Sequence, residues 1–170
     1  MKNYCKISLV ALCLTLPAAV MADEDWTGLY AGVHLGQTRL TGPGVDDSDP
    51  MIGLHAGYDY DLGNWVIGGE LSYDAAAEYS VGGAVSDVTT VRLKFKGGYD
   101  LGRTMVYGIV GLGTIDTGAF KHDGYTLGLG AAYRLSDHVT VGAEYLYDSF
   151  GPKGREFDSD TVLIKASYRF

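Results

Sequence analysis

The last nine residues, from Val162 to Phe170, alternate apolar side chains with polar or small ones and finish on an aromatic ring. Successive side chains of a β-strand point to opposite faces, so this segment has one apolar and one charged face. The apolar face carries Val162, Ile164, Ala166, Tyr168 and Phe170, and the other carries Lys165, Ser167 and Arg169. A soluble sheet shows a similar pattern over one strand, but an apolar face at a chain end favours a strand in contact with lipid.

Seven further segments have the same period of two. Each is about ten residues long, which is the length of a tilted strand that crosses a bilayer. We predict strands over residues 28–36, 53–62, 65–74, 91–100, 105–114, 126–135 and 139–148. The facing of 105–114 stays open, because Val106, Val110 and Leu112 compete with Met105, Tyr107 and Ile109 for the apolar side.

The connections between these segments alternate in length. Residues 39–50, 75–87, 115–123 and 149–159 read as long loops, and 62–64, 101–104 and 135–138 read as tight turns. Long loops at one end and short turns at the other are typical of membrane barrels, in which the turns are periplasmic. Lipid offers no hydrogen bonds to an open sheet edge, so the first and last strands must pair. The predicted fold is therefore all-β: an eight-stranded antiparallel up-and-down transmembrane β-barrel.

The first 22 residues have the pattern of a secretory signal. Lys2 and Lys6 precede an apolar run over residues 7–16, and Val20-Met21-Ala22 forms a small-residue cleavage site. A retained transmembrane helix is disfavoured, because about ten apolar residues fall short of the about 20 that a helical span needs. We therefore expect a cleaved leader over 1–22 and a barrel domain over 23–170.

Composition excludes several classes of function. The chain has 21 acidic and 13 basic residues, and cleavage of the leader removes two of the lysines and none of the acids. This negative balance argues against nucleic acid as a partner, which needs clustered positive charge. Both cysteines, Cys5 and Cys13, lie in the leader, so the mature chain is expected to have no disulfide and no thiolate metal site.

Three segments carry a resemblance to a known family. They are Trp26-Thr27-Gly28-Leu29-Tyr30-Ala31-Gly32, Ile67-Gly68-Gly69-Glu70-Leu71 and the closing Ala166-Ser167-Tyr168-Arg169-Phe170. With the strand pattern, they make the mature chain resemble the small outer-membrane β-barrel proteins of Gram-negative bacteria, of the opacity-protein and OmpA/OmpX type. The resemblance implies that the last strand, through Val162, Ile164, Ala166, Tyr168 and Phe170, is the signal read by the outer-membrane assembly machinery. It also implies residence in the outer membrane.

The inward faces of the predicted strands carry charges of both signs. The interior of an eight-stranded barrel is just wide enough for side chains to fill, so these charges should pair across the lumen. The expected network contains Glu70, Arg92, Lys94, Lys96, Arg134, Glu144, Lys165 and Arg169, with Asp59 and Asp61 as further acids. We interpret this network as a polar plug. The alternative is a narrow ion path that opens when the pairs of Glu70 or Glu144 break.

Other candidate sites are weaker. Asp46, Asp47 and Asp49 are possible ligands for a hard divalent cation, although their spacing lacks the glycine and glutamate of an EF-hand loop. His34 and His55 face inward on neighbouring strands, as metal or haem ligands or as hydrogen-bonded fillers. No recognisable hydrolase motif is present, and we predict no cofactor and no catalytic site.

The sequence thus predicts a monomeric surface protein with a structural or adhesion-type role through four extracellular loops. Its expected partners are outer-membrane lipid, lipopolysaccharide and the barrel assembly machinery; Lys153 and Arg155 are placed to meet lipopolysaccharide phosphates. No motif names a partner for the loops. A narrow channel for small solutes is the second interpretation, and a lipid-modifying envelope enzyme is the third.

Overall fold

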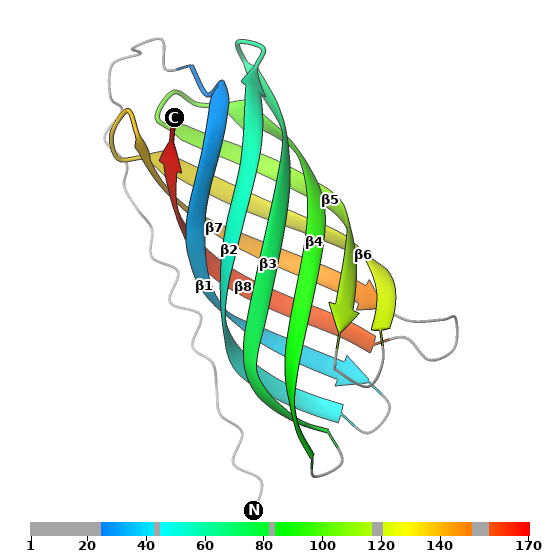
Figure 1. Ribbon diagram of the computed structural model, residues 1–170. Coiled ribbons are helices and arrows are strands. Elements are labelled where there is room, and N and C mark those ends of the chain that lie inside the picture. Colours follow the sequence, from blue (N-terminus) through cyan, green and yellow to red (C-terminus); the bar gives the residue numbers. More distant parts are fainter. Residues whose placement is uncertain (1–24, 43–44, 82–83, 117–120, 151–156) are drawn as a thin grey trace, which may run out of the picture.

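The protein is a closed antiparallel barrel, in which each strand pairs with its neighbours in sequence and the last pairs with the first (Figure 1). The computed structural model describes residues 25–42, 45–81, 84–116, 121–150 and 157–170. Within these ranges no helix is long and apolar enough to cross a bilayer. The strands are β1 (Gly28–Gly42), β2 (Val45–Asp61), β3 (Trp65–Val81), β4 (Ala84–Asp100), β5 (Thr104–Asp116), β6 (Lys121–Arg134), β7 (Val139–Phe150) and β8 (Phe157–Arg169). The predicted leader, 1–22, lies outside the described residues.

Closure is made by β1 and β8. Their register runs from Tyr30 opposite Arg169 to Thr41 opposite Asp158, so the terminal segment that alternates in sequence pairs along most of its length. This pairing satisfies the backbone groups that would otherwise be exposed to lipid. The predicted fold class is confirmed.

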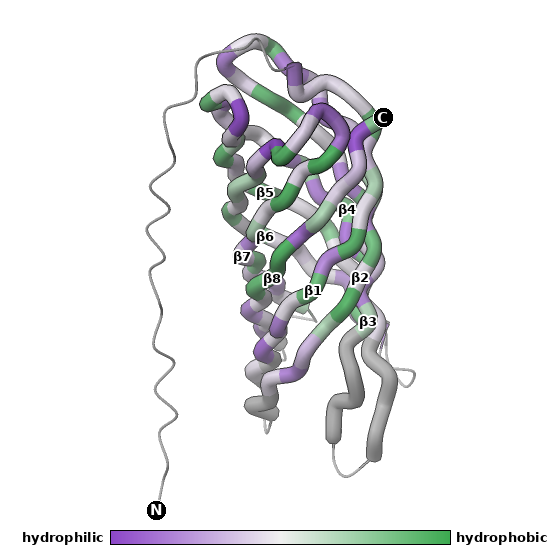
Figure 2. The backbone as a smooth tube through the Cα atoms, turned by 90° about the vertical axis from the view of Figure 1, so that its left-hand side faces the viewer, coloured by the Kyte–Doolittle hydropathy of each residue, from purple (hydrophilic) through white to green (hydrophobic). Residues whose placement is uncertain are grey.

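The apolar rows face outward all around the barrel. Leu129 is 68% exposed and Ile164 is 67% exposed, whereas the inward Glu70 is only 1% exposed. In Figure 2 this appears as alternation between hydrophobic and hydrophilic residues along each strand. On β5, Met105, Tyr107 and Ile109 are buried and Val106, Val110 and Leu112 are exposed, which decides the facing that the sequence left open.

Two of the three tight turns, β2–β3 and β4–β5, share an Asp-Leu-Gly sequence. The carboxylate of Asp61 accepts a hydrogen bond of 2.7 Å from the Gly63 amide, and Asp100 does the same for Gly102. Both glycines have positive φ, 95° and 80°, a conformation that glycine adopts without the steric cost of a Cβ. These turns lie at the same end of the barrel as the C-terminus (Figure 1).

Two of the predicted long loops, 39–50 and 75–87, are wrong, whereas the central parts of 115–123 and 149–159 lie outside the described residues. Residues 45–50 belong to β2, 75–81 to β3 and 84–87 to β4, so the strands continue far beyond the segments that alternate in hydropathy. The physical reason is that hairpins outside the membrane need backbone pairing but no apolar face, and so leave no hydropathy signal. The β3–β4 hairpin extends to Val81 opposite Ala84, with an irregularity in register between Ala76 and Tyr79.

Candidate functional site in the barrel lumen

The lumen holds three clusters of charged or aromatic side chains, stacked along the barrel axis. We define the turn-side group as Trp26, Asp59, Lys96 and Arg169, the central group as Glu70, Lys94, Glu144 and Lys165, and the loop-side group as His34, His55, Asp74, Arg92 and Asp148. All are buried, at 8% exposure or less. Burial of so many ionised groups is costly unless they pair, so their contacts decide what the lumen can do.

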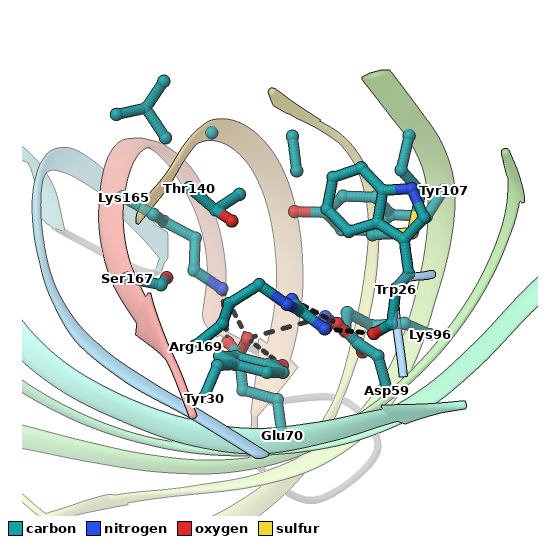
Figure 3. Close-up of a pocket in the computed structure, with 14 residues that line it drawn as sticks. Trp26, Tyr30, Asp59, Glu70, Lys96, Tyr107, Thr140, Lys165, Ser167 and Arg169 are labelled. Carbon is teal, nitrogen blue, oxygen red and sulfur yellow. Dashed lines mark hydrogen bonds and ion pairs between the residues drawn. The ribbon is translucent and has the colours of Figure 1, made fainter. Parts of the chain in front are cut away.

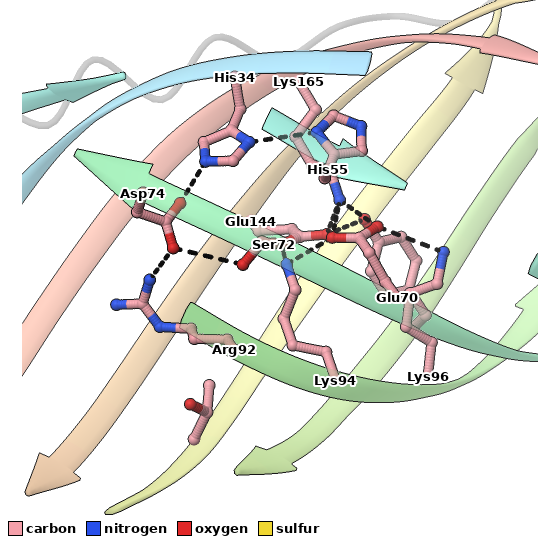
Figure 4. Close-up of polar contacts among 12 residues, drawn as sticks. His34, His55, Glu70, Ser72, Asp74, Arg92, Lys94, Lys96, Glu144 and Lys165 are labelled. Atoms are coloured by element: carbon pink, nitrogen blue, oxygen red, sulfur yellow. Dashed lines mark hydrogen bonds and ion pairs between the residues drawn. The ribbon is translucent and has the colours of Figure 1, made fainter. Parts of the chain in front are cut away.

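The central group is a closed set of ion pairs. Lys94 Nζ lies 2.6 Å from Glu70 Oε1 and 2.9 Å from Glu144 Oε2. Lys165 Nζ lies 2.5 Å from Glu70 Oε2 and 2.8 Å from Glu144 Oε1. Each lysine therefore bridges both glutamates, and the formal charges cancel (Figure 4).

Two tyrosines complete the coordination of the glutamates. Tyr30 donates its hydroxyl to Glu70 Oε2 at 2.8 Å, and Tyr107 donates to Glu144 Oε1 at 2.8 Å. Charge-assisted hydrogen bonds of this kind are stronger than neutral ones. The central group is thus held from β1, β3, β4, β5, β7 and β8 at once.

The turn-side group is built around Trp26, which is fully buried at the barrel end (Figure 3). Its indole Nε1 donates to Asp100 Oδ1 and to the Gly102 carbonyl, both at 3.1 Å. The Arg134 guanidinium lies 4.8 Å from the centroid of its ring, and Arg169 donates to its backbone carbonyl. Trp26 therefore covers the lumen at the turn end.

Below Trp26, one carboxylate serves two cations. Lys96 Nζ lies 2.9 Å from Asp59 Oδ1, and Arg169 Nη1 donates to Asp59 Oδ2 at 3.2 Å. The Lys96 ammonium also lies 4.5 Å from the centroid of the Tyr30 ring, a cation–π contact. A cavity of about 20 Å³ remains between this group and the central one, which is room for about one water molecule.

The loop-side group joins one arginine to two carboxylates. Arg92 donates to Asp148 through Nε at 3.0 Å and through Nη2 at 2.7 Å, and donates from Nη1 to Asp74. The other oxygen of Asp74 contacts His34 Nε2. His34 Nδ1 lies 3.1 Å from His55 Nδ1, which continues the polar chain across β1 and β2 (Figure 4).

Inward glycines make room for the large lumen side chains. Gly53 lies opposite His34 in the β1–β2 register, and a Cβ there would lie 2.6 Å from His34 Cε1. Gly130 lies opposite Tyr107, and a Cβ there would lie 2.6 Å from Tyr107 Cε2. Small inward residues therefore leave the space that large side chains on the neighbouring strand occupy.

Outside the membrane-spanning part, one carboxyl group is tuned locally. The hydroxyl and the backbone amide of Thr27 hydrogen-bond to Asp25 and hold the pKa of its carboxyl below the usual value. The backbone carbonyl of Asp25 accepts a hydrogen bond of 2.5 Å from Arg134 Nη2. The segment before β1 is therefore fastened to β6.

The comparisons with known proteins agree with this architecture. A family model described as outer membrane protein beta-barrel domain matches residues 8–170. The chain belongs to this family. It is accordingly a protein of the outer membrane.

Among curated relatives, this outer-membrane barrel is 28% identical to the 25 kDa outer-membrane immunogenic protein of Brucella ovis, over 91% of this chain and 83% of the relative. The corresponding protein of Brucella abortus is 29% identical, over 88% of this chain and 77% of the relative. Among solved structures it resembles neisserial surface protein A, with a TM-score of 0.68 and 14% identity over 85% of this chain and 98% of that one. Ail, the attachment invasion locus protein of Yersinia pestis, gives a TM-score of 0.58 and 15% identity over 85% and 99%. These two structures support the fold alone.

The outer-membrane barrel brings together most of the charges that the sequence placed in the lumen. Glu70, Lys94, Glu144 and Lys165 form the central group, and Lys96 and Arg169 meet at Asp59 rather than at a glutamate, apart from a 4.0 Å approach of Lys96 to Glu70. Arg134 lies against Trp26 and Asp25. Asp61 accepts from the Trp26 amide at 2.9 Å and so belongs to the turn end.

Sequence reasoning missed three parts of the site. The expected network did not include Asp74 and Asp148, which both bind Arg92, and Trp26 was not foreseen as a cover. It also omitted Leu146 and Leu163, which face inward and are 1% and 2% exposed. The period of two along each strand indicates that all these strand residues face inward. It does not indicate their partners, because these depend on the register between strands.

The structure describes only some side chains of the other predicted sites. The side chains of Asp46 and Asp47 lie outside the described part of the chain, as do Lys153 and Arg155. Among the residues whose side chains are described, no group of three or more His, Cys, Asp and Glu is arranged to hold a metal ion. The apolar row of the last strand, Val162, Ile164, Ala166, Tyr168 and Phe170, is exposed on the outer surface.

Proposed function

We propose that this outer-membrane barrel is a non-catalytic surface protein that acts through the hairpins it holds outside the cell, while its lumen stays closed. The observation that carries the proposal is the continuation of the strands beyond the apolar band. On β3 the last outward aromatic with a described side chain is Tyr73, yet the strand runs on to Val81. These extensions hold paired backbone outside the bilayer, where it can meet other molecules.

The projecting hairpins are suited to contact a partner. Among the described pairings, β2 and β3 separate beyond Met51 and Ala76, and β4 and β5 separate beyond Thr89 and Asp116. The β3–β4 hairpin therefore stands apart from its neighbours and offers surface on both sides. The name of the Brucella relatives, outer-membrane immunogenic protein, supports accessible segments in this family.

We include an adhesion role and an envelope-structure role in the proposal, and one set of strains separates them. A deletion strain is complemented with the wild-type gene or with a variant in which residues 76–88 are replaced by a two-residue turn. The variant is first checked for folding and for surface amount. We expect reduced attachment to cultured cells for adhesion, or reduced resistance to detergent for envelope structure. Unchanged attachment and resistance would rule the proposal out.

The second candidate is a narrow ion channel. It is favoured by the three groups of ionised side chains stacked along the axis, from Arg169 through Glu70 to Arg92. The purified protein in planar bilayers separates the two. We expect no conductance steps above those of protein-free bilayers, because each lysine of the central group is held by two glutamates. Regular openings in the wild-type protein would favour the channel.

We propose that residues 1–22 are a cleaved leader, that the barrel is a monomer without a cofactor and that the apolar row from Val162 to Phe170 is read during assembly. Lipopolysaccharide is the proposed lipid neighbour at the outer leaflet. An enzymatic role in lipid modification is tested by comparing lipid A acyl composition with and without the protein, and we expect no change.

A further inference from the structure

Three side chains of the loop-side group, together with Ser167, form a directed chain of hydrogen bonds from β8 to β3. Ser167 Oγ lies 2.8 Å from His55 Nε2, and His34 and His55 meet through their Nδ1 atoms at 3.1 Å. His34 Nε2 contacts the carboxylate of Asp74. The chain crosses β1 at Gly32, whose register partners are His55 on one side and Ser167 on the other.

The chemistry of imidazole fixes the direction of this chain. A neutral imidazole has one N–H donor and one acceptor nitrogen, and an ionised carboxylate only accepts. His34 therefore donates from Nε2 to Asp74, so its Nδ1 must accept from Nδ1–H of His55. His55 Nε2 then accepts from the Ser167 hydroxyl. With both rings neutral, His34 is the Nε2–H tautomer and His55 is the Nδ1–H tautomer.

The same geometry admits one additional proton and no more. If His34 becomes an imidazolium ion, both its nitrogens donate, and His55 Nδ1 must change from donor to acceptor. His55 then carries its proton on Nε2 and donates to Ser167 Oγ. A second proton would place an N–H on each of the two facing Nδ1 atoms, which removes the hydrogen bond between the rings and brings two cations together.

The charges of the loop-side group favour uptake of that proton. Asp74 and Asp148 are two buried carboxylates that share the single guanidinium of Arg92. With neutral histidines, the loop-side group has one more negative than positive charge. A proton on His34 brings the formal charge of the group to zero and places the positive charge directly against Asp74.

Groups on five strands surround the histidine pair and decide which ring is charged. Burial and the nearby Lys165 ammonium disfavour a cation on His55, whereas His34 contacts the carboxylate of Asp74. The surrounding titratable or charged groups are Tyr30 on β1, Glu70 and Asp74 on β3, Arg92 and Lys94 on β4, Glu144 and Asp148 on β7, and Lys165 on β8.

We propose that His34 and His55 form a binding site for a single proton, held as a His34 imidazolium against Asp74, and that its uptake switches His55 from the Nδ1–H to the Nε2–H tautomer. The proton enters at Nε2 of His55, and the Nδ1 proton of His55 passes to Nδ1 of His34. The site gains one proton, and no other covalent bond changes. The hydrogen bond between His55 and Ser167 reverses its direction. The lumen therefore has two protonation states in which the heavy atoms lie in nearly the same positions.

The test is ring-nitrogen NMR of the full barrel in detergent micelles, with ¹⁵N-labelled histidine, over a pH series from about 8 to about 5, the range in which histidine ordinarily changes charge. His138, exposed in the β6–β7 turn, supplies a ring signal from outside the lumen for comparison. We expect His34 to pass from the Nε2–H form to the doubly protonated form, while His55 stays neutral and exchanges one tautomer for the other. Two imidazolium rings, or no change in either ring, would overturn the proposal.

Two variants separate charge from geometry. Asp148→Asn removes the excess negative charge but leaves the chain from Ser167 to Asp74 in place, so we expect His34 to take up its proton at a lower pH than in the wild type. Thr161→Val changes a buried hydroxyl that bonds to Thr38 and not to the histidines, and should leave the titration unchanged. Identical titration of the Asp148 variant and the wild type would contradict the charge argument.

Discussion

The exposure of Leu129 indicates that lipid, rather than water, surrounds the barrel. Leu129 lies on β6 between Tyr125 and Tyr133, and 68% of its surface is exposed although it is fully apolar. Exposure of this apolar side chain to water would be unfavourable, whereas the hydrocarbon of the bilayer solvates it well. The same holds for Ile164 on β8 and Leu54 on β2, which are 67% and 61% exposed.

Leu129→Arg should therefore destabilise the barrel by about 2 to 4 kcal/mol, the cost of an arginine near the bilayer midplane. Leu135→Arg, in the β6–β7 turn, is the matched control and should cost about 0 to 1 kcal/mol, because arginine near the interface reaches water. Denaturant titration of the protein in lipid vesicles gives both free energies of unfolding. Equal losses for the two variants would show that Leu129 does not face lipid.

An arginine in place of the inward-facing Thr126 should also be costly. Thr126 is fully buried and donates to Asp148 Oδ1 at 2.5 Å, beside Arg92. An inward facing alone is thus no guarantee of tolerance, because the lumen is packed.

Gly53→Ala tests this packing directly. The added methyl group would meet the ring of His34 and would lie 2.6 Å from the carbonyl oxygen of Tyr73, so we expect a loss of about 1 to 3 kcal/mol. Gly97→Ala is the matched control, since a Cβ there meets nothing within 4 Å. That substitution should be neutral or slightly stabilising, because alanine restricts the unfolded chain. The same titration in vesicles measures both, and a tolerated Gly53→Ala would argue against close packing around His34.

At the scale of the elements, the hairpins differ in how their ends are made. At the turn end, Asp61-Leu62-Gly63 and Asp100-Leu101-Gly102 use the same backbone solution, and Leu62 and Leu101 each donate a backbone hydrogen bond across the turn, at 2.7 and 2.8 Å. At the other end the strands simply continue outward. The turns are specified locally by sequence, and the outer hairpins are specified by pairing.

Gly63→Ala should cost about 1 to 2 kcal/mol, because its φ of 95° is unfavourable for a residue with a Cβ. A Cβ at this position meets nothing within 4 Å, so the loss would come from the backbone alone. Asn64→Ala, in the same turn and exposed, should stay within about 0.5 kcal/mol of the wild type. Comparison of the two urea midpoints checks this, and an equal shift would assign the effect to the turn in general.

The strands were predictable from sequence wherever lipid imposes a period of two, and not beyond. The inward facing of Arg92, Lys94 and Lys96 follows from their spacing, since lipid-facing positions between them are apolar. Their partners do not follow, because Asp148 is 56 residues from Arg92 and reaches it only through the closed order of the strands. His55 and Ser167, 112 residues apart, meet for the same reason.

At the scale of the whole molecule, Trp26 ties together every second strand. Its backbone and ring contact Asp61 at the end of β2, Asp100 at the end of β4, Arg134 on β6 and Arg169 on β8. These four contacts exist together only in the closed barrel. The segment before β1 is therefore part of the folded unit.

Trp26→Ala should destabilise the barrel by about 3 to 5 kcal/mol, the usual cost of deleting a large buried aromatic side chain. Trp65→Ala removes an equal volume from a side chain that is 59% exposed, and should cost less. Thermal or urea unfolding of both variants in the same lipid makes the comparison. If Trp65→Ala proves the more harmful, the assigned role of Trp26 as a buried cover is wrong.

The closed hydrogen-bonded sheet should also resist sodium dodecyl sulfate at room temperature. Without heating, we expect the folded protein to migrate on a denaturing gel at a position different from that of the boiled chain, because the barrel stays compact. In plain buffer without any surfactant it should aggregate, since its apolar rows would then face water. A monodisperse protein in such buffer would be incompatible with a lipid-covered surface.

The position of Trp26 has a consequence for biogenesis. A chain that has not yet received β8 lacks Arg169, and its indole has only part of its final surroundings. The ring and backbone of Trp26 reach their final contacts only when the sheet has closed, so the cover of the lumen at the turn end is completed last.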